Sequence, residues 1–189
     1  MTDRPTSPRI EPVGEPDAEL QEILAGALTH DGTPLNIFGV LGRHPKLLKR
    51  FNLLGGFLLN KGLVPPRERE VVILRIGWNA QARYEFGQHT VIGRRCGLTD
   101  DEILSLTRPV EEHDWSAQDR ALIALADELA EDDCVSDGTW SLLAERWDDA
   151  ELVELLILAG FYRMVSGFLN SAGVQLDDGV PGFPGDATG

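Results

Sequence analysis

The chain of 189 residues is poor in cysteine and in basic residues. Its two cysteines, Cys96 and Cys134, are too few for a disulfide framework, and they fit a reduced, intracellular protein better than a secreted one. Lysine and arginine number 17 against 31 aspartates and glutamates, so the net charge is −14. Because such a chain repels polyanions at long range, the sequence predicts no binding to nucleic acid.

The sequence also shows no clear signal peptide or membrane-spanning segment. Residues 1–16 are polar and contain four prolines, without the apolar run of a signal peptide. The most apolar segment, residues 152–169, contains Glu154 and Arg163 and is marginal in length for a membrane span. The sequence therefore predicts a soluble, cytoplasmic protein that does not bind membranes.

The length and the hydrophobic content set the expected domain organisation. A chain of this size with 42% hydrophobic residues can bury one full core. We expect a single helical domain over residues 17–175. A flexible amino-terminal arm, residues 1–16, precedes it, and a flexible tail rich in glycine and proline, residues 176–189, follows it.

Helical patterns dominate the chain, and strand alternation joined by hairpin turns is missing. The predicted fold class is therefore all-α. Asp17, Ser116 and Asp148 are suited to cap helices, and Gly97 to end one. We expect helices over residues 18–30, 36–44, 45–62, 67–81, 83–96, 99–106, 116–133, 136–147 and 150–171.

The local structure of two segments can be predicted in two ways from the sequence. The apolar run 71–76 fits a buried strand or a buried helix, and the helix is favoured because the run continues without turn signals or a nearby hairpin partner. Gly55 and Gly56 are unfavourable inside a helix. They mark either a break or a place where another backbone comes close.

Three side chains suggest proton-transfer chemistry. Glu85 and His89 are four residues apart and share one face of a helix, and Glu70 reaches them only if the two segments pack together. Two carboxylates that meet in a cleft of low polarity raise the pKa of one of them, so that it can act as an acid near neutrality. His89 can relay or accept the proton, with Tyr84 and Gln88 as orienting, substrate-binding groups.

Each of these residues also has a purely structural interpretation. Glu70 suits a helix start or a salt bridge with a nearby arginine, and Glu85 with His89 suits an exposed pair contributing about 0.2–0.5 kcal/mol. An acid–histidine pair at this spacing can also hold a metal, but no third or fourth ligand is evident. We therefore predict neither a metal nor an organic cofactor.

The segments NIFGVLGRHPKLLKRF and REREVVILRIGWNAQARYEFGQHTVIGRRCGLTDDEI resemble the carboxymuconolactone decarboxylase family, whose relatives include AhpD-like alkylhydroperoxidases. The later segments WSAQDRALIALADEL and FYRMVSGFLN extend the resemblance over roughly residues 30–172. The resemblance implies an all-helical core and assembly into trimers or hexamers through helical contacts. Apolar surface on the helix over residues 152–169 would suit such an interface, and burial inside one subunit explains it equally well.

The peroxidase branch of this family carries the pattern Glu-x11-Cys-x2-Cys-x3-His, in which the two thiols perform the redox chemistry. In this chain Glu70 and His89 match the outer positions, but Ala82 and Glu85 occupy the thiol positions. Neither forms a thiolate, and Cys96 lies about 10 Å beyond His89 along the same helix. A carboxylate four residues before the histidine is similar instead to the decarboxylase branch, whose substrates are small acidic lactones and which needs no organic cofactor.

Three functions from different classes follow. The leading one is a cofactor-independent acid–base enzyme that decarboxylates or isomerises a small acidic lactone or carbonyl compound. The second is an AhpD-type antioxidant peroxidase, and the third is a non-catalytic oligomeric binding protein.

Overall fold

The computed structural model describes residues 3–30 and 32–186. Within these residues nearly all regular structure is helical, which confirms the all-α class. A single turn of 3-10 helix, Val110–Glu112, and one short strand pair accompany the helices. The α-helices are α1 (Ala18–Leu24), α2 (Asn36–Leu41), α3 (Pro45–Asn60), α4 (Pro66–Asn79), α5 (Arg83–Arg95), α6 (Asp100–Ser105), α7 (Ala117–Asp132), α8 (Asp137–Ala144) and α9 (Asp149–Ala172).

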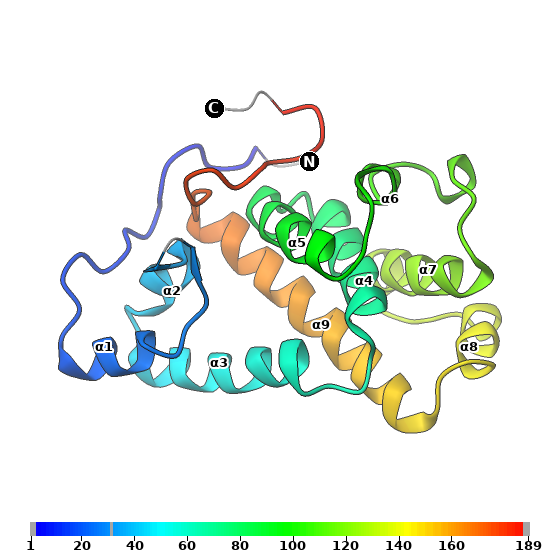
Figure 1. The fold of residues 1–189 in the computed structure, drawn as a ribbon, viewed down its shortest axis with the longest axis horizontal. Coiled ribbons are helices and arrows are strands. Elements are labelled where there is room, and N and C mark those ends of the chain that lie inside the picture. The colour runs from blue at the N-terminus through cyan, green and yellow to red at the C-terminus, as the bar shows by residue number, and fades with distance from the viewer. Residues whose placement is uncertain (1–2, 31, 187–189) are drawn as a thin grey trace.

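The core is built around α4, which packs against α5, α7 and α9 (Figure 1). The side chains of Val71, Val72, Ile73 and Leu74 are all completely buried, so α4 has no solvent-exposed stripe over this run. A helix covered on every side loses the amphipathic period that normally reveals it. This explains why the run also fitted a strand, and the preferred helix is confirmed.

Helix α9 crosses the middle of the molecule (Figure 1). Asp148 and Glu151 form a capping box at its start, and Gly173 ends it with a positive φ of 69°. By length and composition α9 is apolar enough to cross a membrane, but 56% of its most apolar window is buried inside the protein. Its hydrophobicity therefore serves mainly the core.

The predicted helix over residues 18–30 is wrong in its second half. Asp17 caps α1 as expected, but α1 ends at Leu24. A two-residue strand β1 (Thr29–His30) pairs antiparallel with β2 (Thr33–Pro34), so the expectation that hairpins are missing is also wrong here. Gly26 disfavours continuation of the helix, and Gly32, with φ of 79°, provides the turn between the strands.

Helix α3 continues through Gly55 and Gly56, so the alternative of a break is wrong. A Cβ atom at Gly55 would lie 3.3 Å from the ring of Phe161 on α9. The residue that comes close is therefore an aromatic side chain rather than a backbone. Because glycine has no side chain here, the aromatic ring packs directly on α3.

Both terminal segments contact the helical body. The Arg9 amide donates to the Ala172 carbonyl at the end of α9, and the Val13 amide donates to the Gly39 carbonyl in α2. In the tail, Phe183 packs against Trp78, with ring centroids 5.2 Å apart. The flexibility expected of the arm and the tail stays a prediction.

Candidate functional site

The side chains of Glu70, His89 and Glu85 form a continuous chain of polar contacts, with the imidazole in the middle. His89 Nδ1 lies 2.6 Å from Glu70 Oε2, and His89 Nε2 lies 3.2 Å from Glu85 Oε1. Glu70 is completely buried, and Glu85 and His89 are only 4% and 5% exposed. The interpretation of Glu85 and His89 as an exposed surface pair is therefore wrong. The two carboxylates meet through the imidazole rather than directly.

Two glycines allow α4 and α5 to pack closely enough for this contact. A Cβ atom at Gly77 on α4 would lie 3.4 Å from the Phe86 amide nitrogen on α5. A Cβ atom at Gly93 on α5 would lie 3.1 Å from Leu98 and 3.4 Å from Leu74. Side chains larger than a methyl group at these positions would push the helices apart and separate Glu70 from His89.

Arg69 forms the outer end of the chain of charges. Its Nε donates to Glu70 Oε1 at 3.0 Å, and one terminal nitrogen donates to the Leu59 carbonyl at 2.7 Å. Glu70 is thus shared between a guanidinium and an imidazole. The expected salt bridge of Glu70 with a nearby arginine exists, alongside its contact with His89.

The surroundings of His89 favour the charged imidazolium. Burial lowers the pKa of His89, but the adjacent carboxylates of Glu70 and Glu85 outweigh burial and raise it to about 10. The ring of Tyr162 meets the imidazole edge-on, with centroids 4.9 Å apart. Burial and the same two carboxylates raise the pKa of Tyr162 well above its ordinary value, so this phenol stays neutral. At neutral pH the imidazolium donates a hydrogen bond to each carboxylate.

Folding stability should fall on the alkaline side because of His89. Its pKa is higher in the folded protein, at about 10, than the ordinary 6.5. The stabilisation is therefore complete below pH 6.5 and is lost progressively as the pH rises toward 10. Urea unfolding at pH 6, 8 and 10 measures this, and His89→Gln should lose less stability over the interval. Equal losses in both proteins would contradict the assignment.

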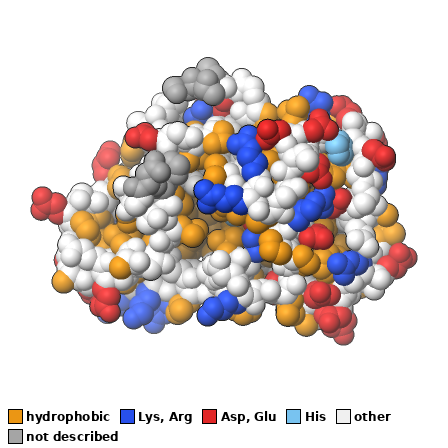
Figure 2. Space-filling model, viewed as in Figure 1, with side chains coloured by type: hydrophobic (Ala, Val, Ile, Leu, Met, Phe, Trp, Pro, Cys, Tyr) orange, Lys and Arg blue, Asp and Glu red, His pale blue; other side chains and the backbone are white. Residues whose placement is uncertain are grey.

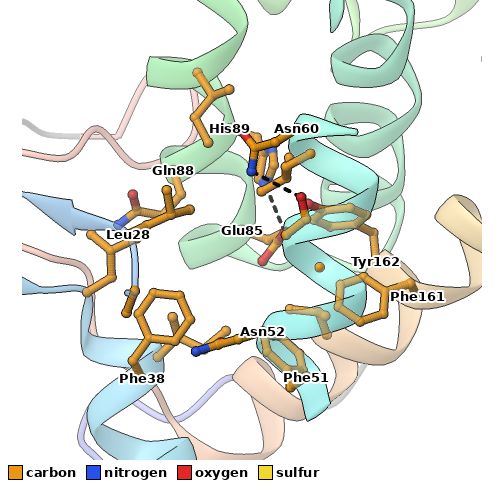
Figure 3. Close-up of a pocket in the computed structure, with 18 of the residues that line it drawn as sticks. Leu28, Phe38, Phe51, Asn52, Asn60, Glu85, Gln88, His89, Phe161 and Tyr162 are labelled. Atoms are coloured by element: carbon orange, nitrogen blue, oxygen red, sulfur yellow. Dashed lines mark hydrogen bonds and ion pairs between the residues drawn. The ribbon is translucent and has the colours of Figure 1, made fainter. Parts of the chain in front are cut away.

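Glu85 and His89 line a small pocket between α2, α3, α5 and α9 (Figure 3). Glu70 is not part of the lining and contacts His89 through Nδ1. The cavity volume is about 140 Å³, similar to the cavity of about 150 Å³ that takes up benzene in another protein. The proton-transfer groups thus face a space that fits one small ring. Aromatic side chains form much of the wall, namely Phe38, Phe51, Phe161, Tyr84 and Tyr162.

Tyr84 and Gln88 line the same pocket, but their polar atoms bind the chain itself. Asp177 Oδ2 accepts from the Tyr84 hydroxyl at 2.7 Å and from Gln88 Nε2 at 2.6 Å. Asp177 Oδ1 accepts from the backbone amide of Asn36 at 2.9 Å. Asp177 therefore fastens the segment after α9 to α5 and to the start of α2. The substrate-binding role of Tyr84 and Gln88 stays a prediction.

Sequence reasoning missed the contribution of α3, above all Asn52. This residue follows Leu48 by four positions and precedes Gly55 by three, so it lies on the inward face of α3. A polar residue on an apolar helical face was the available signal. Tyr162 and Asp177 were missed as well, because their contacts join segments far apart in the chain.

Other reactive groups are not gathered at the pocket. Cys96 is half-buried, with its sulfur 3.9 Å from an Arg69 nitrogen, and Cys134 is exposed; neither lines the pocket. Among residues 3–30 and 32–186, no group of three or more His, Cys, Asp or Glu side chains is arranged to hold a metal ion.

Comparison with protein families matches residues 45–128 to the carboxymuconolactone decarboxylase family. The matched segment contains Glu70, Glu85 and His89. No curated protein sequence matches the chain.

Solved structures show the same fold over nearly the whole chain. An uncharacterized peroxidase-related protein with an alkylhydroperoxidase AhpD core, from Ralstonia eutropha JMP134, is 18% identical with a TM-score of 0.79, covering 93% of this chain and 95% of that one. A peroxidase-related protein from Silicibacter sp. TM1040 is 14% identical with a TM-score of 0.80, covering 94% and 96%. The debrominase Bmp8 is 15% identical with a TM-score of 0.75, covering 90% and 92%. These likenesses confirm the AhpD-like fold and leave the activity open.

Proposed function

We propose that the chain is a cofactor-independent acid–base enzyme of the carboxymuconolactone decarboxylase-like family, which moves protons on a small carbonyl compound or lactone. One observation carries the proposal: a carboxylate and an imidazolium stand side by side on the wall of a pocket of about 140 Å³. Such a pair supplies a proton acceptor and a hydrogen-bond donor to one bound molecule.

Each residue has a role in this reaction. Glu85 removes a proton from the carbon next to the substrate carbonyl, and its carboxylate becomes a carboxylic acid. As Glu85 becomes neutral, His89 Nε2–H turns from Glu85 to the carbonyl oxygen and donates a hydrogen bond there as negative charge develops. Glu85 then returns the proton to a carbon further along, and the double bond moves. With a carboxylated substrate, loss of carbon dioxide leaves the same kind of carbanion, which takes its proton from the His89 imidazolium, and a proton from water then restores His89. Glu70 and Arg69 hold His89 in place and in its charged form.

A solvent-exchange assay tests the proposal. The protein is incubated in deuterium oxide with β,γ-unsaturated cyclic ketones and lactones, and proton NMR follows both isotope exchange and movement of the double bond. We expect catalysed exchange next to the carbonyl of at least one compound. If neither exchange nor isomerisation exceeds the buffer rate across the set, the enzyme proposal fails in favour of a binding protein.

Peroxidase activity is the alternative suggested by the names of two structural neighbours. It requires a reactive and a resolving thiol. Ala82 and Glu85 stand at the two thiol positions, and neither cysteine lines the pocket. Consumption of an organic hydroperoxide with a thiol reductant separates the two functions, and we expect none above background.

The size of the pocket agrees with a ring-shaped ligand. A variant of the neighbour Bmp8, with the same fold and a TM-score of 0.70, has been solved in complex with 2,3,4-tribromopyrrole, a small unsaturated ring. In the present chain the aromatic wall of Phe38, Phe51 and Phe161 suits the flat face of such a ring.

We also propose that the chain assembles with copies of itself through an apolar face of α3 and α9. Val153, Ile157 and Met164 follow one side of α9 and are 62%, 51% and 54% exposed, and Leu53 on α3 is 70% exposed. Glu154 on α9 accepts from the backbone amides of Leu63 and Val64 and so fastens α9 to the segment between α3 and α4.

Replacing Ile157 with glutamate should dissociate the assembly, because a carboxylate buried between apolar surfaces lacks a partner. Light scattering measures the mass of the wild type and the variant. Leu142→Glu on α8, which is 50% exposed in the wild type, is the matched control and should leave the mass unchanged. A monomeric wild type would refute the proposed interface.

A further inference from the structure

The pocket carries little charge for a site that would receive an acidic substrate. Among the described residues lining it, Glu85 and His89 bear charge, and no lysine or arginine is present. The rest of the lining consists of aliphatic, aromatic and amide side chains together with glycines. A carboxylate that enters such a pocket normally needs a cation to offset the loss of its water.

The one cation on the wall is already balanced. His89 and Arg69 bring two positive charges to the chain of contacts, and Glu70 and Glu85 bring two negative charges. A substrate carboxylate would therefore add a negative charge without a free counterion. The net charge of −14 on the whole chain repels anions further, and acidic side chains are spread around the face shown in Figure 2.

An unused hydrogen-bond acceptor lies on the other side of the pocket. Asn52 Oδ1 is buried and has no hydrogen-bond partner within the protein. Figure 3 shows Asn52 across the cavity from Glu85 and His89. Asn60, also in the lining, differs because its amide nitrogen already donates to the Gly56 carbonyl. A buried acceptor without a partner costs folding free energy, and a turn of the Asn52 amide toward the cavity would let a ligand O–H or N–H group satisfy it.

We propose that the pocket selects an uncharged, unsaturated ring compound that donates a hydrogen bond to Asn52 while its reactive carbon lies at Glu85 and His89. This inference rests on the proposed function and narrows it. Neutral carbonyl compounds become the substrate class in place of acidic lactones, and isomerisation becomes the reaction in place of decarboxylation. Asn52 is then the residue that sets the orientation of the ring.

Competition binding tests both parts of the inference on the full chain. Fluorobenzene serves as the fluorine NMR probe, and phenol, benzamide and benzoate are added as competitors. Benzamide and benzoate share a shape and differ in charge, so benzamide should bind at least about 10-fold more tightly. Phenol carries a donor that fluorobenzene lacks, so Asn52→Leu should weaken phenol about 10-fold and leave fluorobenzene unweakened. Asn170→Leu, at an amide side chain on α9 outside this pocket, is the matched control and should keep the affinity for phenol once its folding has been verified.

Three results would overturn the inference. Benzoate binding as tightly as benzamide would refute the selection against charge. Asn52→Leu weakening phenol no more than fluorobenzene would refute the role of Asn52, and fluorobenzene failing to bind up to its solubility would refute the ring-sized site. The solvent-exchange assay separates this failure from that of the proposed function. If the protein catalyses deuterium exchange but does not prefer benzamide to benzoate, only the inference about substrate selection is wrong. If it shows the expected binding preferences but catalyses no exchange, the pocket is a selective binding site and the enzyme proposal is wrong.

Discussion

Replacing Glu85 with glutamine should lower kcat/KM for deuterium exchange by about 10²- to 10⁴-fold, the range expected when a positioned general base is lost. Glutamine fills the same space and can still accept a hydrogen bond from His89, so the pocket should keep its shape. It cannot take up a proton from carbon at neutral pH. Steady-state kinetics on a compound that the wild type turns over measures the change.

A buried glutamate outside the pocket provides the control for this substitution. Glu154 is 8% exposed and accepts hydrogen bonds from the Leu63 and Val64 amides. Glu154→Gln should therefore keep the activity of the wild type once its folding has been verified. If Glu85→Gln and His89→Ala both left turnover unchanged, neither residue would take part in the reaction, and the catalytic proposal would have to be abandoned.

Removing the carboxylate of Glu70 should have the largest effect on stability. Glu70→Ala leaves the guanidinium of Arg69 and the imidazolium of His89 in the core without the anion that they share. Breaking a buried ion pair by removing one partner typically costs about 3–5 kcal/mol. Urea unfolding at pH 7 measures the loss. The pKa of His89, followed by NMR, should fall in the same variant because one of the two carboxylates that raise it is gone.

A substitution at an exposed glutamate controls for the loss of one negative charge without the loss of a buried ion pair. Glu131 lies exposed in the last turn of α7, and Glu131→Ala should change the free energy of unfolding by less than about 0.5 kcal/mol. The double variant Glu70→Ala, His89→Ala should lose less than the sum of the two single losses, because the residues are in direct contact. Strict additivity would mean that the contact does not stabilise the protein.

The spacing of residues along one helix was a sound guide to the site. Glu85 and His89 share a face of α5 simply because they are four residues apart, and this held without knowledge of the fold. Whether that face pointed to solvent or into a pocket was a different question. The answer depends on α2, α3 and α9, which come from both ends of the chain.

Contacts between distant segments account for most of what sequence reasoning missed. Asp177 binds Tyr84 and Gln88 across about 90 positions, and Phe161 packs on Gly55 across more than 100. The wrong end predicted for the first helix had a local cause. Helix α1 ends at Leu24 because Gly26 disfavours helix and the residues after it pair as strands, although the preceding residues favour helix.

By itself the sequence determined the helical class, most helix starts through their capping residues, the resemblance to the family and the absence of thiols at the two thiol positions. These depend on the identity of residues and on spacings of a few positions, which local backbone geometry converts directly into structure. Only the tertiary structure decided that His89 stands between two buried carboxylates, that the pocket is the size of a single ring and that Asn52 faces the pair across it. Burial and charge pairing arise from the packing of distant helices, and no local rule contains that information.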